Sequence, residues 1–333
     1  YVQQVTPDPE SLSVHLHHSF VALPDDNYTP REYHPYSGYW KFSYFDYSTP
    51  ISEPTEQRFI TRHRLNKKTP HAAKSEAVEP IVYYLDPGIP EPVMTALKEG
   101  ASWWNQAYEA AGYKDAFQVK VLPEGADPMD VRYNVINWVH RATRGWSYGS
   151  SVVDPRTGEI IKGHVTLGSL RVRQDYLIAL GLTSPFKEGN TDTTAQQEMA
   201  LDRIRQLSAH EVGHTLGIAH NFAASENNRA SVMDYPHPKI SIKNGKISLE
   251  GAYDKGIGAW DIHAVEYGYQ DFASDVEEAE ALAKIIVKGR NEGLSFKSDP
   301  DTRSSRHASA NGHMWENGSN PLDAFDEISQ VRE

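Results

Sequence analysis

The sequence predicts an α+β fold in which a β-rich segment precedes a larger domain of strands and helices. Near the N-terminus, aromatic residues alternate as in half-buried strands. Further along, short strand-like runs occur beside long segments with apolar residues at helical spacing. We therefore divide the 333 residues into a β-rich N-terminal segment (1–75), a central domain (78–272) and a C-terminal helical or irregular extension (273–333).

The N-terminal segment is expected to contain three strands. Trp40, Phe42 and Tyr44 occupy every second position, which predicts a strand with one buried face. The polar tract 66–80 contains two prolines and is interpreted as a linker. The predicted strands cover residues 14–21, 39–47 and 58–64.

The central domain is predicted to run in the order strand, helix, four strands, helix. Apolar residues recur at helical spacing from Val93 to Ala111, and Gly112 is a suitable C-cap. Ser274 and Glu277 form a possible capping box for a late helix. We expect strands over 81–85, 117–122, 133–139, 146–153 and 160–167, and helices over 93–111, 194–216, 257–269 and up to about Gly289.

Composition excludes several classes of protein. The net charge of −12 argues against a nucleic-acid partner, whose phosphates require clusters of Lys and Arg. No apolar run approaches the ~18 residues of a membrane span. The chain has no cysteine, which rules out disulfides and thiolate metal ligands. Because it opens at Tyr1 without an apolar signal region, we expect a processed or engineered fragment.

The most informative stretch is H-E-V-G-H-T-L-G-I-A-H, which begins at His210. His210 and His214 project from one face of a helix, so both rings can reach one metal ion, with Glu211 close by but not bound. Gly217 permits positive φ, so the helix can stop and His220 can return as a third ligand. Three histidines leave the fourth zinc position open for water, as in catalytic sites. A chance match on a surface helix explains five fixed positions poorly.

A second feature lies downstream in the sequence S-V-M-D-Y-P. It contains Met233 and, two residues later, Tyr235. Taken alone, Met233 would be interpreted as a core residue and Tyr235 as a buried aromatic residue. Behind a zinc signature, both residues become candidates for the site.

Together, the extended histidine motif and the downstream methionine resemble the metzincin clan of zinc endopeptidases. The resemblance implies a metzincin-like catalytic domain, with a twisted mixed sheet, helices above the cleft and an irregular helical lower subdomain. It implies that Met233 forms an apolar floor beneath the metal. Tyr235 matches the tyrosine that astacin-like and serralysin-like members place beside the zinc. The arrangement is also similar to a family of large bacterial metzincin-like peptidases of poorly defined role.

The resemblance also implies where the substrate lies. In metzincins the fourth strand borders the cleft and pairs with the substrate backbone, and residues 146–153 occupy the corresponding place. The resemblance further implies an exported protein, which is periplasmic, at the cell surface or secreted. The candidate substrate-binding residues are Trp146, Ser147, Tyr148, Gly149, Ser150 and Ser151.

The predicted function is hydrolysis of peptide bonds in a protein or peptide substrate. One zinc ion activates a water molecule, Glu211 is the general base, and Tyr235 assists catalysis. One alternative is an exported surface binding module with a vestigial or structural zinc site. Another is a peptidase with glutamate as third ligand, for which Glu250 and Glu266 are available.

Asp299 and Asp301 suggest calcium only weakly, because Asp-x-Asp in a loop is usually turn chemistry. His263 is expected to be structural. The sequence leaves open the oligomeric state, the cleavage specificity and the role of residues 1–75.

Overall fold

The centre of the molecule is a six-stranded sheet in the order β3-β10-β8-β5-β7, with β9 also paired to β10. Within this sheet β9 and β10 are antiparallel, and the other pairs of neighbouring strands are parallel. The computed structural model describes residues 16–141, 146–189, 191–302, 308–315 and 317–333. The strands are β3 (Arg62–His63), β5 (Ile81–Leu85), β7 (Phe117–Val121), β8 (Asn134–Val139), β9 (Tyr148–Val153) and β10 (Glu159–Gly168).

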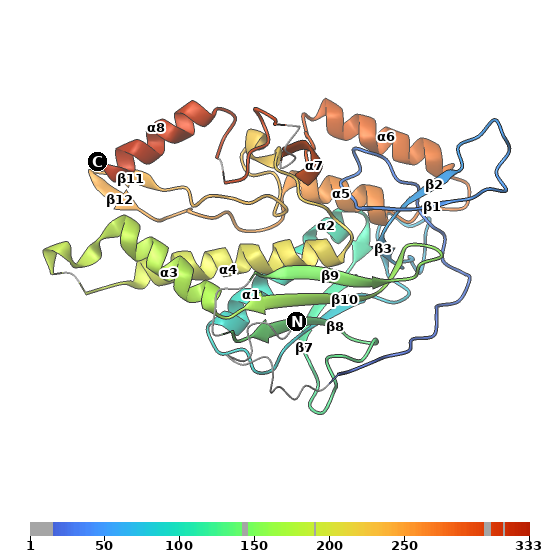
Figure 1. Ribbon diagram of the computed structural model, residues 1–333, viewed down its shortest axis with the longest axis horizontal. Helices are drawn as coiled ribbons and strands as arrows, with labels where there is room; N and C mark the ends of the chain where they lie inside the picture. The colour runs from blue at the N-terminus through green and yellow to red at the C-terminus, as the bar shows by residue number, and fades with distance from the viewer. Residues whose placement is uncertain (1–15, 142–145, 190, 303–307, 316) are drawn as a thin grey trace, which may run out of the picture.

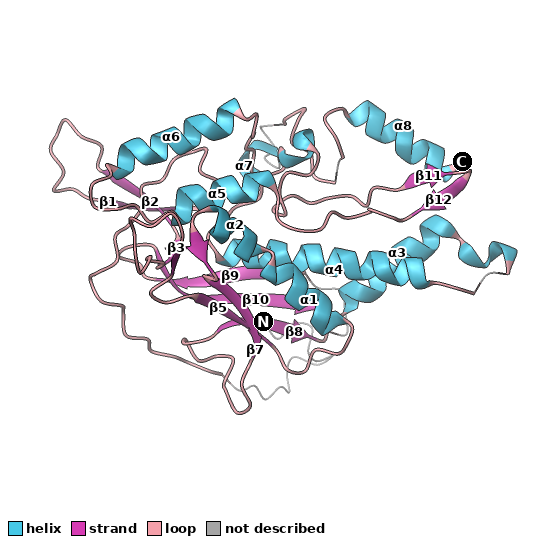
Figure 2. Cartoon of the chain, turned by 180° about the vertical axis from the view of Figure 1, so that it is seen from behind, coloured by secondary structure: helices cyan, strands magenta, loops and turns pink. Residues whose placement is uncertain are grey.

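Helices α1 (Val93–Ser102), α2 (Trp104–Ala110) and α4 (Thr194–Thr215) pack against this sheet. Figure 1 shows α4 between the sheet below it and the C-terminal segments above it, and Figure 2 shows the same layers from behind. Tyr83 of β5 and Val212 of α4 belong to the one core cluster that joins these layers. Helix α4, which carries the first two histidines of the motif, therefore lies at the centre of the molecule.

The N-terminal segment forms a hairpin and then contributes β3 to the central sheet. Strands β1 (Lys41–Phe45) and β2 (Glu56–Ile60) are antiparallel, with Lys41 opposite Ile60. The buried Arg31 joins this segment to the end of α5 (Ala259–Tyr269), because its guanidinium donates to the carbonyls of Tyr267 and Gln270. A further short sheet pairs β4 (Ser75–Glu76) with β6 (Tyr113–Lys114).

The segment after α4 is largely irregular and is held by one buried carboxylate. Asp261 accepts hydrogen bonds from the Ser231 hydroxyl and from the backbone amides of Val232 and Gly258. It therefore fixes the loop before Met233 onto α5. The elements here are β11 (Ser241–Lys243), β12 (Lys246–Ser248), α5 (Ala259–Tyr269), α6 (Glu278–Asn291), α7 (Asp299–Thr302) and α8 (Pro321–Arg332), with short 3-10 helices η2 (Pro185–Glu188) and η3 (Ala224–Asn227).

Most predicted elements are confirmed, but several details were wrong. Residues 16–21 form no strand. The helix predicted over 93–111 is interrupted at Trp103. Glu277 precedes α6 without a side-chain cap, so the capping box is not formed. The strand predicted from Trp146 begins at Tyr148.

Two helices were not predicted, α3 (Leu170–Thr183) and α8. Helix α3 buries only Asp175 and Ala179, and α8 buries no residue among those described. Helix α3 lacks the apolar stripe that makes a surface helix recognisable, whereas α8 repeats apolar residues at Leu322, Phe325, Ile328 and Val331, a spacing that the sequence-based prediction did not use.

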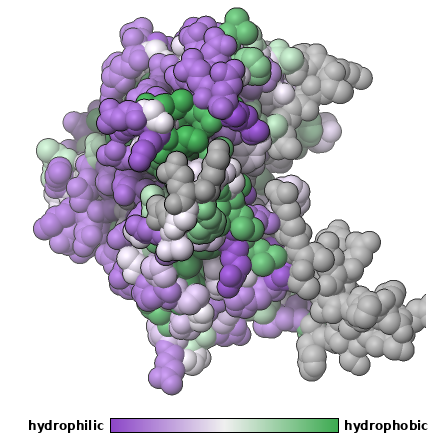
Figure 3. Space-filling view, turned by 90° about the vertical axis from the view of Figure 1, so that its left-hand side faces the viewer, coloured by the Kyte–Doolittle hydropathy of each residue, from purple (hydrophilic) through white to green (hydrophobic). Residues whose placement is uncertain are grey.

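The surface agrees with the acidic, polar composition. Figure 3 shows mostly hydrophilic side chains on the side of the molecule that faces left in Figure 1. Among the described residues, no helix is both long enough and apolar enough to span a bilayer.

Candidate metal centre and active site

Helix α4 positions the first two histidines of the motif. His210 and His214 lie one turn apart on a buried face, with ring centroids 4.7 Å apart. The His210 Nδ1–H donates to the Val232 carbonyl at 2.8 Å, and the His214 Nδ1–H donates to the Ile218 carbonyl at 2.9 Å. A carbonyl oxygen cannot donate, so both rings are held in the tautomer that leaves Nε2 unprotonated.

The third histidine follows a turn that only glycine permits. Gly217 has φ of 94°, as its position in the motif predicts, and a Cβ there would lie 1.9 Å from the Thr61 carbonyl oxygen. The chain then turns back, and His220 Nε2 comes within 3.1 Å of His214 Nε2. The histidine motif therefore folds against the N-terminal segment as well as against its own helix.

The three imidazoles fit a zinc ion. Their ligand atoms all lie within 4.8 Å of one another, and His210, His214 and His220 form the only such cluster found among the described residues. His214 Nε2 and His220 Nε2 are 3.1 Å apart, close to the separation of about 3.3 Å between two nitrogens bound at about 2.0–2.1 Å to one tetrahedral zinc ion. Burial lowers the pKa of His210 well below its usual range and that of His214 to about 3, so both rings are neutral at neutral pH. Neutral imidazole is the form that binds a metal.

His220 is oriented by Asp299, a residue that the sequence analysis connected with calcium instead. The His220 Nδ1–H donates to Asp299 Oδ2 at 2.6 Å. Asp299 is the first residue of α7. The segment before it is held by Asn221, whose side chain forms hydrogen bonds with the backbone of Ser295 and Lys297. The described residues show no calcium-like cluster at Asp299 or Asp301. No sequence signal links Asp299 to a histidine 79 positions away.

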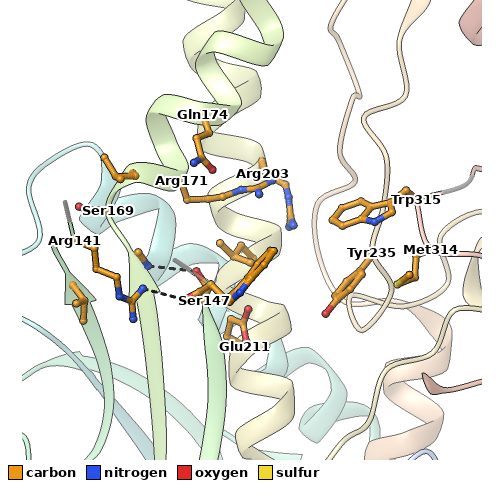
Figure 4. Close-up of a pocket in the computed structure, with 15 residues that line it drawn as sticks. Arg141, Ser147, Ser169, Arg171, Gln174, Arg203, Glu211, Tyr235, Met314 and Trp315 are labelled. Carbon is orange, nitrogen blue, oxygen red and sulfur yellow. Dashed lines mark hydrogen bonds between the residues drawn. The ribbon is translucent and has the colours of Figure 1, made fainter. Parts of the chain in front are cut away.

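Glu211 is a buried carboxyl group beside the histidine cluster. Burial raises its pKa to about 8, while Arg203 and the Gly149 backbone amide lower it. Strand β9 lies so close to α4 that a Cβ on Gly149 would be 2.2 Å from the Glu211 carbonyl oxygen. Glu211 also lines a cavity that opens between β9 and Tyr235 (Figure 4).

Met233 lies against the helix turn that carries the histidines. Its side chain is 0% exposed. A Cβ on Gly213 would lie 2.2 Å from Met233 Sδ and 2.6 Å from Trp104 Cζ2, so Gly213 allows the thioether and the indole to approach the helix backbone. The position of Met233 agrees with the expected apolar floor beneath the histidines. The need for glycine at position 213 was not readable from the motif, in which that position is variable.

Tyr235 packs among the rings of the cluster. Its ring centroid is 4.7 Å from His220 and 5.3 Å from His210. Trp315 stacks on the other face at 5.0 Å, and its amide donates to the Tyr235 carbonyl. In Figure 4 the hydroxyl end of Tyr235 points to the side of the cavity where Glu211 lies.

The predicted substrate strand lies beside the cluster. Within the described ranges β9 pairs with β10 alone, and its residues alternate between exposed and half-buried from Tyr148 to Val153. Ser151 donates to the Thr215 carbonyl, and Ser150 is opposite His164 of β10. Trp146 and Ser147 precede the strand and line the cavity with Glu211.

The N-terminal segment also reaches the site. Trp40 stacks on His214 with centroids 5.2 Å apart and planes 10° apart. Its amide donates to the Gly217 carbonyl, and the Ala219 amide donates to Gly38. Trp40 was predicted to lie on one face of a strand, and its contact with His214 was not predicted, because stacking between residues so far apart in the sequence leaves no local pattern.

The alternative third ligands lie elsewhere. Glu250 pairs with Lys243, and Glu266 pairs with Lys288, so neither belongs to the cluster. The predicted structural role of His263 agrees with its burial against Trp260 and Gly289.

We expect Asp299→Ala to weaken zinc binding by about 10- to 100-fold, because a carboxylate that accepts the Nδ1–H of a ligating histidine orients and polarises its ring. Competition with a chromophoric chelator measures this change. Asp301→Ala is the control, since that carboxylate accepts the Ser298 amide instead. Equal losses in the two variants would contradict an orienting role for Asp299.

We expect Gly213→Ala to lower the thermal unfolding midpoint, because the new methyl group overlaps Met233 and Trp104 and overpacking costs about 1–3 kcal/mol. Gly181→Ala is the matched helical control. It has no atom within 4 Å of the new Cβ and should stabilise the protein by up to about 1 kcal/mol. The same gain at both positions would show that Met233 packs loosely.

Comparison with known proteins agrees with this geometry. Residues 192–333 match the family model described as Met-zincin, and residues 2–68 match one described as a domain of unknown function (DUF5117). No curated protein matches the sequence. The first match contains all three histidines, Glu211, Met233 and Asp299, and the second contains Trp40. This chain therefore carries a Met-zincin domain over residues 192–333, with the three-histidine cluster as its candidate zinc site.

Proposed function

We propose that this chain is a zinc-dependent endopeptidase acting on protein or peptide substrates. The observation that carries the proposal is the position of Glu211, a buried residue that follows the first of three converging histidines on α4 and lines a cavity. A structural zinc site closes its fourth position with another protein ligand and has no use for a general base. This favours an enzyme over an exported binding module with a vestigial or structural zinc site.

The residues suggest a division of labour during hydrolysis. A zinc ion held by His210, His214 and His220 would lower the pKa of a water molecule to about 7 and polarise the scissile carbonyl. Glu211 accepts a proton from the attacking water and delivers it to the leaving amine. Burial raises the pKa of the Glu211 carboxyl group, and a zinc ion beside it would lower that pKa, so that the ionised form is present to accept the proton.

The substrate backbone is proposed to lie along β9. This strand borders α4 at Gly149, immediately beside Glu211, and its pairing within the described residues uses one edge. An extended peptide can add to such an edge through main-chain hydrogen bonds, whatever its side chains are. The Tyr235 hydroxyl is proposed to donate a hydrogen bond to the oxyanion that develops at the scissile carbonyl.

Glu211→Gln should keep zinc and the folded state but lower kcat on a generic protein substrate by about 10²- to 10⁴-fold, because the amide cannot accept the proton. Zinc content and circular dichroism establish that the site is intact. Glu250→Gln, on an exposed residue paired with Lys243, is the control. Turnover near that of the unmodified protein in Glu211→Gln would exclude the mechanism.

Tyr235→Phe retains the ring packing and removes the hydroxyl. If that hydroxyl stabilises the oxyanion, kcat/KM should fall by about 10- to 10³-fold. Zinc content should stay constant because the three histidines are untouched. Tyr44→Phe, in the exposed part of β1, provides a matched control. An unchanged kcat/KM would leave Tyr235 with a packing role.

A further inference from the structure

The cavity beside Glu211 is unusually basic for a chain of net charge −12. It has a volume of about 390 Å³ and is lined by three arginines, Arg141, Arg171 and Arg203, which come from three different segments. In Figure 4 Arg171 and Arg203 extend from their helices toward the side where Trp315 lies, and Arg141 lies further away, beside Ser147. Apolar walls are supplied by Leu207, Met314 and Trp315.

Arg203 is the most deeply buried of these cations. It lies on α4, about two turns before Glu211, and is 4% exposed. One of its Nη atoms donates to the Gln206 side chain, but Nε has no hydrogen-bond partner within the part of the chain that the structure describes. A buried guanidinium with an unsatisfied donor is costly unless an anion joins it.

The neighbouring charges do not neutralise the cavity. Arg171 forms an ion pair with the buried Asp175, at 2.8 Å. Arg141 donates to the Trp146 carbonyl, which carries no net charge. Among the residues that the structure describes, three guanidinium groups therefore lie near two carboxylates, those of Asp175 and Glu211, and Glu211 is committed to the proton transfers proposed above.

The position of the cavity identifies the part of the substrate that enters it. This step rests on the proposed function: Glu211 protonates the leaving amine, so that amine lies within hydrogen-bond reach of Glu211. A cavity that opens beside Glu211 therefore receives a group from the residue that carries this amine.

We propose that this cavity selects substrates with a carboxylate on the residue immediately after the scissile bond, and that Arg203 is its principal recognition residue. The planar guanidinium matches a carboxylate by paired hydrogen bonds, and the apolar walls accommodate the methylene groups that carry it. The carboxylate belongs either to an Asp or Glu side chain or to the C-terminus of a substrate cut next to its last residue.

Two pairs of fluorogenic peptides distinguish these sources. The first pair differs only in Glu or Gln after the scissile bond, inside a longer peptide. The second pair ends at that position, with Ala bearing a free carboxylate or a carboxamide. We expect kcat/KM to favour the carboxylate by about 10- to 100-fold in one pair, the range for a hydrogen bond to a charged group. Cleavage with ratios near one in both pairs would overturn the proposal.

Variants assign the preference to the cavity. Arg203→Gln should reduce the favoured ratio to near one, and Arg203→Lys should retain part of it, because the charge remains but the fork is lost. Arg141→Gln, on a more exposed residue, should reduce it less and guards against misfolding of the Arg203 variants. Arg173→Gln, an exposed residue of α3 that does not line the cavity, is the control and should leave the ratio unchanged. If the kcat/KM ratio between the carboxylate and neutral peptides is unchanged in both Arg203 variants, Arg203 is not the recognition residue.

A binding measurement separates this proposal from the proposed function. Zinc-loaded Glu211→Gln protein is titrated with the same peptides, uncleaved, by calorimetry. A 10-fold or greater preference in Kd for the carboxylate peptide, lost when Arg203→Gln is added to Glu211→Gln, supports the cavity proposal. If that result is found and the unmodified protein cleaves no peptide, only the peptidase proposal fails. Equal Kd values within both pairs would overturn the cavity proposal.

Discussion

Each histidine of the cluster depends on a hydrogen-bond acceptor that a different part of the chain supplies. Val232 comes from the loop before Met233, Ile218 from the turn at Gly217, and Asp299 from the C-terminal extension. Because these acceptors engage Nδ1 of each ring, they favour the tautomer in which the Nε2 lone pair is free, and the three Nε2 atoms point toward one another. Metal binding therefore requires the loop, the turn and the extension to be in place together, although the ligands themselves span only eleven residues.

The rest of the fold can be understood as support for this requirement. Asp261 fastens the loop before Met233 to α5, and Asn221 fastens the C-terminal extension to the end of the histidine motif. The N-terminal segment contributes β3 to the sheet and stacks Trp40 on His214. Residues before and after the central domain thus add contacts to the ligands that lie within it, so that removing either flank would remove a group that contacts a ligand.

Chemistry and selectivity are arranged along one helix. In the proposed mechanism, helix α4 presents His210 and His214 to the metal position, Glu211 to the reacting atoms and Arg203 to the neighbouring cavity. Residues on successive turns keep fixed relative positions because the helix is buried on both sides. A carboxylate bound at Arg203 would therefore be held at a constant distance from the general base, which is how a remote contact can align a scissile bond.

By itself, the sequence determined the α+β class, most strands and helices, and the identity of the three histidines and Glu211. These features have local signatures: α4 was predicted within a residue of its observed ends, and Gly217 adopts the positive φ that its position requires. Tertiary structure alone decided the roles of Asp299, Trp40 and Arg203, because each acts through a contact that joins distant segments or a cavity that several elements enclose. Helix α3 escaped prediction because it buries too little to impose a pattern, whereas the buried residues of α4 left one in the chain.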